Sequence, residues 1–208
     1  MNRFEKLKTS LDLRAEPVGV KLIYDFNKNV EIDNRFKETH SLEGYCQYVK
    51  RASNGEFLKI KRGDFLCKIA NTVLSFERSE NIELSMELDI KGLKYILLFP
   101  INKFELNDFD SIILIVNPRN CLIIIKTFVK LYRKPLKLTL GAVTGVCSEV
   151  TAHVIKREEV NFSFLCENSR MNVVFDDCEL LCGIPAKMTK ELIDGINNNI
   201  LNNQKNVF

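Results

Sequence analysis

Hydrophobic residues gather in short runs along the chain, and these runs predict strands. Val18–Tyr24 is rich in β-branched residues and partly alternating, while residues 94–99 and Ser111–Val116 are almost continuously apolar. Continuous runs are typical of strands that are buried on both faces of a sheet. Residues 82–88 alternate cleanly and predict a strand with one buried face. Shorter strands are expected at residues 57–61 and 136–140.

Apolar residues at helical spacing predict helices between these strands. The clearest lie at residues 119–132 and 187–200, and a shorter helix at residues 1–12 ends before Glu16-Pro17. Two further helices each carry a cysteine on an apolar face, one containing Cys46 and the other Cys67. Strands and helices thus alternate along most of the chain.

This order predicts one domain over residues 1–208, of the α/β (or α+β) class, with a mixed sheet and helices packed on its faces. The polar segment 25–38 is expected to be a loop. Residues 176–182 are expected to form one or two helical turns that end at Gly183-Ile184-Pro185. Residues 201–208 are expected to form a flexible, asparagine-rich tail.

The charge and composition indicate which partners and which compartment to expect. The net charge is +3, from 30 basic and 27 acidic residues, which is too small to indicate a nucleic-acid partner. The N-terminus lacks the apolar core of a secretory signal, and no apolar run approaches the roughly 20 residues that span a membrane. We therefore expect a cytoplasmic protein, in which the seven cysteines stay reduced.

The segment 141–170 contains the most suggestive chemistry. It places Cys147 at a predicted helix start and Cys166 at a predicted strand end, and Ser169 and Arg170 follow closely. A helix start and a neighbouring arginine both favour the thiolate form of cysteine. Reduced cysteines in such positions indicate metal binding, thiol chemistry or burial in the core.

Several short motifs, in this order, resemble the ArCR family, also called domain of unknown function 169. The motifs are Leu13-Arg14-Ala15-Glu16-Pro17-Val18-Gly19-Val20-Lys21-Leu22, Cys46 with Val49 and Ala52, Cys67, Asn117-Pro118, Cys147-Ser148-Glu149, Cys166-Glu167-Asn168-Ser169-Arg170 and Gly183-Ile184-Pro185. The resemblance extends from Leu13 to about Ile196 and implies an origin in archaea or anaerobic bacteria. It assigns Cys46, Cys67, Cys147 and Cys166 to the family's cysteine pattern. The chain departs from that pattern where Asn168 and Ser75 replace expected glycines.

Four cysteinates are the usual protein ligands of a [4Fe–4S] cluster. We therefore expect Cys46, Cys67, Cys147 and Cys166 to bind such a cluster, although zinc, thiol redox chemistry and a buried core remain alternatives. Cys178 and Cys182 lie four residues apart, a spacing that suits either one helical face in the core or a metal chelate, and Cys121 is expected in the core.

Two arginines complete the candidate site, because a guanidinium can bind an anionic group with two hydrogen bonds. Arg14 and Arg170, both within family motifs, are expected to hold an anionic small molecule or to balance the negative charge of a cluster. His153 follows Cys147 on the same predicted helix, where it could pair with Cys147 or Cys166 as an acid or base.

The sequence favours a [4Fe–4S] iron–sulfur protein of anaerobic metabolism, acting in electron transfer, sulfur handling or the maturation of a cofactor or enzyme. A metal-free binding or scaffold subunit with buried structural cysteines is the first alternative. A cysteine-dependent thiol enzyme is the second. A protein partner or a second copy of the chain is expected, whereas nucleic acid and membrane are not.

Overall fold

The structure is a computed structural model that describes most of the chain. It covers residues 2–24, 32–39, 42–77, 87–88, 90–104, 108–173 and 175–205, with side chains as far as residue 198. The strands are β1 (Val18–Tyr24), β2 (Lys37–Glu38), β3 (Leu58–Lys61), β4 (Leu93–Pro100), β5 (Ser111–Val116), β6 (Asn161–Ser163) and β7 (Leu180–Pro185). The helices are α1 (Arg3–Leu11), α2 (Tyr45–Ser53), α3 (Lys68–Val73), α4 (Pro118–Tyr132), the π-helix η1 (Gly145–Ala152), α5 (His153–Arg157), α6 (Glu167–Asn172) and α7 (Ala186–Lys205).

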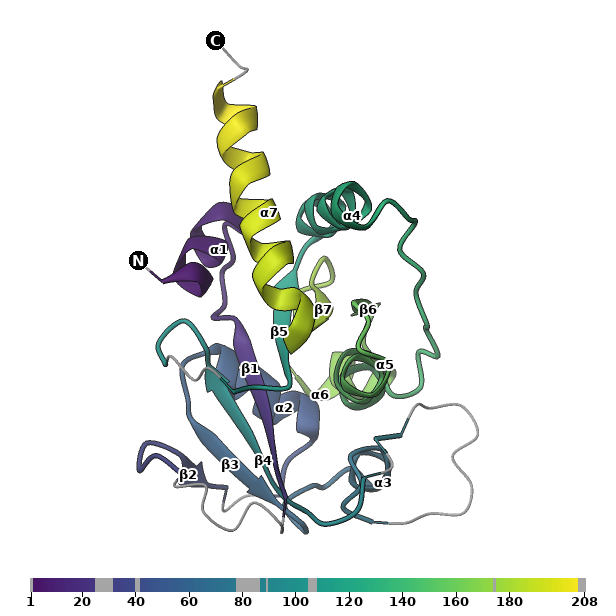
Figure 1. Ribbon diagram of the computed structural model, residues 1–208. Helices are drawn as coiled ribbons and strands as arrows, with labels where there is room; N and C mark the ends of the chain where they lie inside the picture. Colours follow the sequence, from purple (N-terminus) through teal and green to yellow (C-terminus); the bar gives the residue numbers. More distant parts are fainter. Residues whose placement is uncertain are drawn as a thin grey trace.

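The strands pair into one sheet in the order β2-β3-β4-β1-β5-β7-β6. The pair β2–β3 is parallel and the other pairs are antiparallel, so the sheet is mixed. Helices pack on it: α7 lies in front of the sheet and α2 behind it (Figure 1). The predicted α/β class with a mixed sheet is confirmed.

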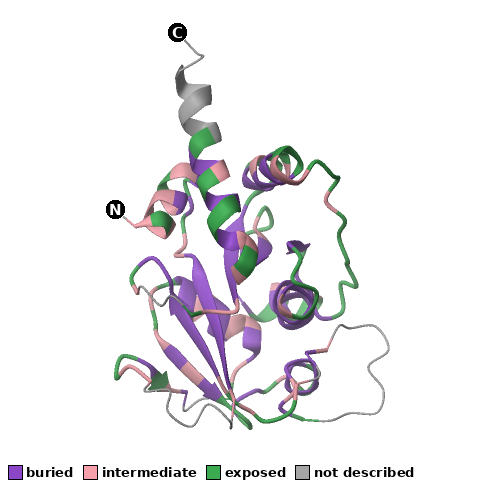
Figure 2. Cartoon of the chain, viewed as in Figure 1, coloured by how far each residue is buried: buried purple, intermediate pink, exposed green. Residues whose placement is uncertain are grey.

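Alternation along the central strands gives the sheet two apolar faces. In β5, Ile112 and Leu114 face a core shared with α1, α4 and α7, while Ile113 and Ile115 face a core shared with α2, α3 and η1. All six residues of β5 are buried, as the continuous apolar run predicts. The strands at the centre of the sheet are buried almost throughout (Figure 2).

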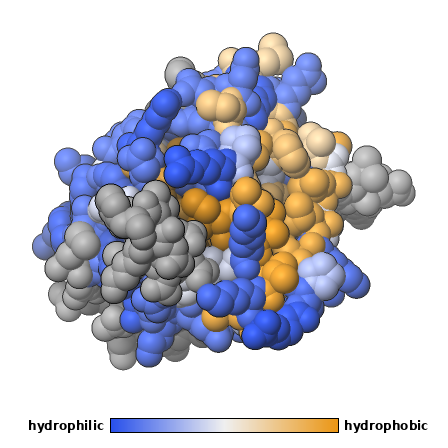
Figure 3. Space-filling model, turned by 90° about the horizontal axis from the view of Figure 1, so that it is seen from above, coloured by the Kyte–Doolittle hydropathy of each residue, from blue (hydrophilic) through white to orange (hydrophobic). Residues whose placement is uncertain are grey.

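Local sequence explains where the most regular helix begins. Asn117 caps α4 by accepting a hydrogen bond from the backbone N–H of Asn120 at 2.9 Å, and Pro118 supplies a first residue already fixed in helical φ. Leu122 and Val129 are exposed apolar residues of α4, and this helix lies at the upper end of the molecule in Figure 1. Figure 3 shows hydrophobic residues gathered on this end between hydrophilic ones.

Three sequence predictions differ from the structure. The segment 176–182 is not helical, because its second half joins β7 and Gly183-Ile184-Pro185 continues that strand. The segment 136–140 lies near β6 without pairing as a strand, since Asn161 bonds the backbone of Thr139 through its side chain instead. The predicted tail is helical as far as Lys205. The predicted strand at 82–88 lies largely outside the described residues. Of the predicted loop at 25–38, residues 25–31 also lie outside them, and residues 37–38 form the short strand β2, which the sequence did not predict.

The backbone conformation at Ser75 explains why the family pattern has a glycine at this position. It follows α3 and adopts a φ of 64°, a left-handed conformation that glycine reaches without strain. The glycine expected there suits this backbone. Asn168 lies inside α6, where its φ is not positive, so the other expected glycine has no such explanation.

Candidate cysteine pocket

A pocket of about 440 Å³ opens on the face of the sheet that α2, α3 and η1 cover. Its wall contains Cys46, Cys67, Cys147 and Cys166. The chain thus brings together two pairs of cysteines that are far apart in sequence, as the cysteine pattern led us to expect. We call this site the cysteine pocket.

Each of these cysteines lies at the beginning of a helix. Cys46 is in the first turn of α2 and Cys147 in the first turn of η1, whereas Cys67 and Cys166 are the residues that immediately precede α3 and α6. The first turn of a helix has backbone N–H groups without intrahelical partners. Here the N–H groups of Gln47 and Ser148 donate to the carbonyls of Gly44 and Thr144, and both lie near enough to the sulfurs of Cys46 and Cys147 to act against the rise in thiol pKa that burial causes.

The first pair of cysteines is joined through the segments that precede α2 and α3. The N–H of Leu66 donates to the carbonyl of Glu43 at 2.9 Å, and Glu43 forms a parallel bridge with Phe65. The two chain segments therefore enter the pocket side by side. Their next turns carry Cys46 and Cys67.

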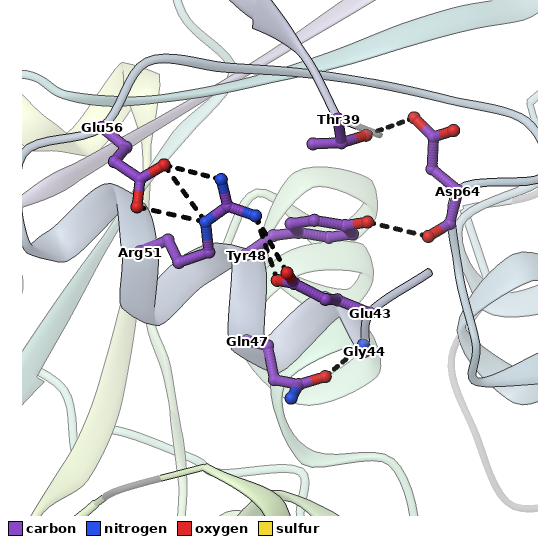
Figure 4. Close-up of polar contacts among 8 residues, drawn as sticks. All are labelled: Thr39, Glu43, Gly44, Gln47, Tyr48, Arg51, Glu56 and Asp64. Atoms are coloured by element: carbon purple, nitrogen blue, oxygen red, sulfur yellow. Dashed lines mark hydrogen bonds and ion pairs between the residues drawn. The ribbon is translucent and has the colours of Figure 1, made fainter. Parts of the chain in front are cut away.

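Side chains of α2 fix this junction (Figure 4). The Tyr48 hydroxyl donates to the backbone carbonyl of Asp64 at 2.9 Å. Arg51 donates to Glu43 at 3.0 Å and to Glu56 at 2.7 Å, which holds the residue before the helix against the helix itself. These contacts position α2 relative to the turn that leads to α3.

The second pair is brought together by a close approach that only glycine permits. A Cβ on Gly145 would lie 2.8 Å from the backbone N of Cys166, from Cα of Leu165 and from Oγ of Ser163. Because Gly145 has no side chain, η1 begins directly against the segment that leads to Cys166. Leu165 has a φ of 70°, a strained conformation for a branched residue.

Glu149 secures the same junction from inside η1. Its side chain is buried, and one carboxylate oxygen accepts from the N–H groups of Gly141 at 2.6 Å and Ala142 at 2.8 Å. The other oxygen accepts from the Ser163 hydroxyl. One buried carboxylate therefore links η1 to the loop before it and to the end of β6.

The π-helix itself is unusual. Helices of this kind are rare and frequently occur at functional sites. In η1 all eight residues are buried, and Cys147 is among them. The sequence predicted a helix at Cys147, but it did not predict that this helix is a π-helix.

Comparison with known proteins identifies a family. The chain matches the DUF169 family, described as uncharacterised ArCR, over residues 6–195. It belongs to this family. No curated protein and no solved structure matches the chain.

Burial dominates the electrostatics of the thiols in this ArCR protein. It raises the pKa of the Cys46 thiol, and it raises that of Cys147 well above the ordinary value. The sulfurs of Cys67, Cys166 and Cys46 raise the pKa of Cys147 further, so these thiols lie close enough to interact. Both Cys46 and Cys147 are neutral thiols at neutral pH when nothing is bound.

The remaining cysteines of the ArCR protein lie away from the pocket. Cys121 and Cys182 are buried in the core on the opposite face of the sheet, and Cys178 is exposed. Cys178 and Cys182 therefore do not share a helical face, because Cys182 belongs to β7. Within the described residues, no group of three or more His, Cys, Asp or Glu side chains is arranged to hold a single metal ion.

Arg14 and Arg170 are not among the residues that line the cysteine pocket. The Arg170 guanidinium donates to three backbone carbonyls, those of Phe164, Asp176 and Glu179. Arg14 is exposed and pairs with the Asp176 carboxylate at 3.1 Å. In this geometry both guanidinium groups fasten the segment after α6, and their hydrogen bonds go to residues outside the pocket lining.

His153 also lies outside the pocket lining. Burial lowers its pKa, and its Nε2 lies 4.0 Å from the carboxylate of Glu159. Sequence reasoning missed several residues that do line the pocket, among them Tyr45, Thr144 and Leu66. Tyr45 and Leu66 each adjoin a family cysteine, and this neighbourhood is the one sequence signal that could have identified them.

None of the helices in the described part of the chain has the length and apolar character that a membrane span requires.

Proposed function

We propose that this ArCR protein binds an iron–sulfur cluster of the [4Fe–4S] type through Cys46, Cys67, Cys147 and Cys166. One observation carries the proposal: these four cysteines line one pocket, whereas the chain's other three do not. Reduced cysteines that converge from four separate helix starts have a stronger claim to a shared ligand than to chance burial.

The donor set fits a cluster better than a single ion. A single zinc ion needs its ligands within about 2.3 Å of one point, and no group of three described side chains is so arranged. A [4Fe–4S] cluster instead takes one thiolate at each of four irons, so its ligands stand apart around a larger body. A pocket of about 440 Å³ with four thiols in its wall suits that requirement.

The backbone around the sulfurs supports the same assignment. The N–H groups of Gln47 and Ser148, which donate to the carbonyls of Gly44 and Thr144, also lie near the sulfurs of Cys46 and Cys147, and N–H groups close to sulfur help set the properties of bound clusters. Apolar side chains of Val146 and Ala70 exclude water from the inner wall. A bound cluster would supply one-electron transfer, and the role is electron transfer, sulfur handling or maturation in the cytoplasm of an anaerobe.

Neutral, buried thiols argue against the thiol-enzyme alternative. A cysteine nucleophile acts as thiolate, and burial here raises the pKa of Cys46 and Cys147. Among the described residues, no histidine lines the pocket to remove the proton.

One observation favours the metal-free binding alternative. Leu66 is 68% exposed and Val143 is 49% exposed, and both line the pocket. Exposed apolar side chains around a pocket are common at interaction sites. A binding subunit would keep this surface but take up no iron.

Anaerobic reconstitution separates these functions. The wild-type protein is incubated with iron and sulfide, desalted, and measured for iron, acid-labile sulfide and visible absorption. The proposal expects about four irons and four sulfides per chain. Serine substitution of Cys46, Cys67, Cys147 or Cys166 should each reduce the bound iron, while Cys121→Ser and Cys178→Ser should not. A colourless wild-type protein without bound iron would overturn the proposal.

A further inference from the structure

Apolar and basic residues form two neighbouring rows on the solvent side of α4. Residues three, four or seven positions apart lie on the same side of a helix. Leu122 and Val129, which are 52% and 41% exposed, therefore form an apolar row with the partly buried Ile125. Surface helices usually present polar residues to solvent, so an aligned apolar row indicates an interaction surface. The basic row beside it consists of Arg119, Lys126 and Lys130.

These two rows, which we call the α4 face, carry positive charge without local compensation. Residues 111–148 contain six Lys or Arg and no Asp or Glu, although the net charge of the whole chain is only +3. Arg119 and Lys126 are exposed, and neither forms an ion pair within the described part of the chain. Acidic groups reach α4 at its C-terminal end, where the Tyr132 hydroxyl donates to the Glu191 carboxylate at 3.1 Å.

The combination of positive charge and aliphatic side chains indicates the chemistry of a partner. In a symmetric contact, a second copy of the chain would bring the same basic row against this one, and like charges oppose that contact. The phosphates of a nucleic acid would pair with the basic row and leave the apolar row uncovered. Helices that insert into a membrane surface have a wide apolar face, often with Trp or Phe, whereas this row has three aliphatic residues.

We propose that the α4 face is a docking site for an acidic amphipathic helix of a protein partner. The two rows run along a helix of 15 residues, a shape that a second helix can follow. The partner's aliphatic side chains cover the apolar row, and its carboxylates pair with the basic row. The α4 core lies on the opposite side of the sheet from the cysteine pocket, so this site is distinct from that pocket.

Binding of a synthetic peptide to the full chain tests the proposal. The peptide has about 20 residues, a length at which a helix can form, with Glu in one row and Leu in the neighbouring row. A control peptide has the same composition, with Glu and Leu spread evenly around the helix. Fluorescence anisotropy of the labelled peptides should show tighter binding of the first peptide. Added salt should weaken this binding, because salt screens exposed charges.

Substitutions in either row should weaken the binding. Arg119→Glu combined with Lys126→Glu should raise the Kd of the acidic peptide by roughly fivefold or more, because two attractive pairs become repulsive. Leu122→Ala should raise it by roughly three- to fivefold, because less apolar area is buried. Lys91→Glu and Leu42→Ala are the matched controls, since both residues are exposed and lie outside α4. All variants should unfold at the urea midpoint of wild type, which shows that they are folded.

Three results would overturn the proposal. The first is that the acidic peptide binds no more tightly than its control peptide, or binds equally well to the α4 variants. The second is binding to vesicles of phosphatidylcholine and phosphatidylglycerol, or to a short DNA duplex, but not to the peptide. The third is a dimer in sedimentation velocity that Leu122→Ala abolishes, which would assign the face to a second copy. None of these measurements involves iron, so their outcome is independent of the proposed cluster.

Discussion

Substitution of Gly145 by alanine tests whether close contact at the start of η1 builds the cysteine pocket. The added Cβ would lie 2.8 Å from three atoms, two of which belong to the backbone of Leu165 and Cys166. Ordinary carbon contacts are about 3.5–4.0 Å, so the chain must open by roughly 0.7 Å or more. Flexible side chains could not absorb this shift, because backbone atoms form the obstacle.

The expected cost follows from this crowding. Overpacking of a close contact typically destabilises a protein by about 1–3 kcal/mol, and the gain from replacing glycine in a helix offsets about 0.5–1 kcal/mol. We therefore expect Gly145→Ala to lower the free energy of unfolding by about 1–2 kcal/mol, measured by urea denaturation of the metal-free protein. The accessibility of Cys147 to alkylation should rise as the wall of the pocket moves.

A second glycine separates loss of stability from damage to the pocket. Gly55 has a φ of 108°, and its nearest obstacle is the flexible end of Lys103 at 3.4 Å. Gly55→Ala should destabilise through backbone strain, by about 1–2 kcal/mol, without exposing Cys147. If Gly145→Ala unfolds at the same urea concentration as wild type, the close-contact argument is wrong.

Three other predictions follow from buried groups. Gly183→Ala should destabilise at least as much as Gly145→Ala in the same urea assay, because its Cβ would lie 2.5 Å from the carbonyl oxygen of Val150; an equal midpoint to wild type would contradict this. Glu149→Gln should cost about 1.5–3 kcal/mol of unfolding free energy, since the buried carboxylate accepts bonds from Gly141, Ala142 and Ser163, and a cost near zero would show that its charge is unimportant. Iron uptake during reconstitution should rise with pH, because burial raises the pKa of Cys46 and Cys147 and binding must displace their protons; uptake independent of pH would argue that these thiols are not ligands.

Much of the fold could be predicted because its signals are local. The continuous apolar run at β5 and the β-branched run at β1 gave correct strand bounds, since a strand buried on both faces needs apolar residues at every position. The helix predicted at residues 119–132 was found from its apolar residues at helical spacing. The segment 176–182 was misread because four-residue spacing of Cys178 and Cys182 suits a helix as well as a turn followed by a strand.

The sequence predicted which cysteines form the candidate site, but not how the folded chain brings them together. Cysteine spacing and the family resemblance selected Cys46, Cys67, Cys147 and Cys166, but spacing cannot state which distant segments meet. Arg170 illustrates the limit: its charge suggested an anionic ligand, whereas the folded chain directs its guanidinium to backbone carbonyls. A charged side chain takes whichever partners the tertiary structure brings within reach.

The sequence by itself determined the class of fold, the main strands and the set of cysteines, because each depends on residue type and local period. Tertiary structure alone decided that these cysteines share a pocket and that η1 winds as a π-helix. These features depend on contacts between segments about 20 to 120 residues apart, such as that of Gly145 with Cys166. Such contacts form only when the sheet has brought its covering helices together.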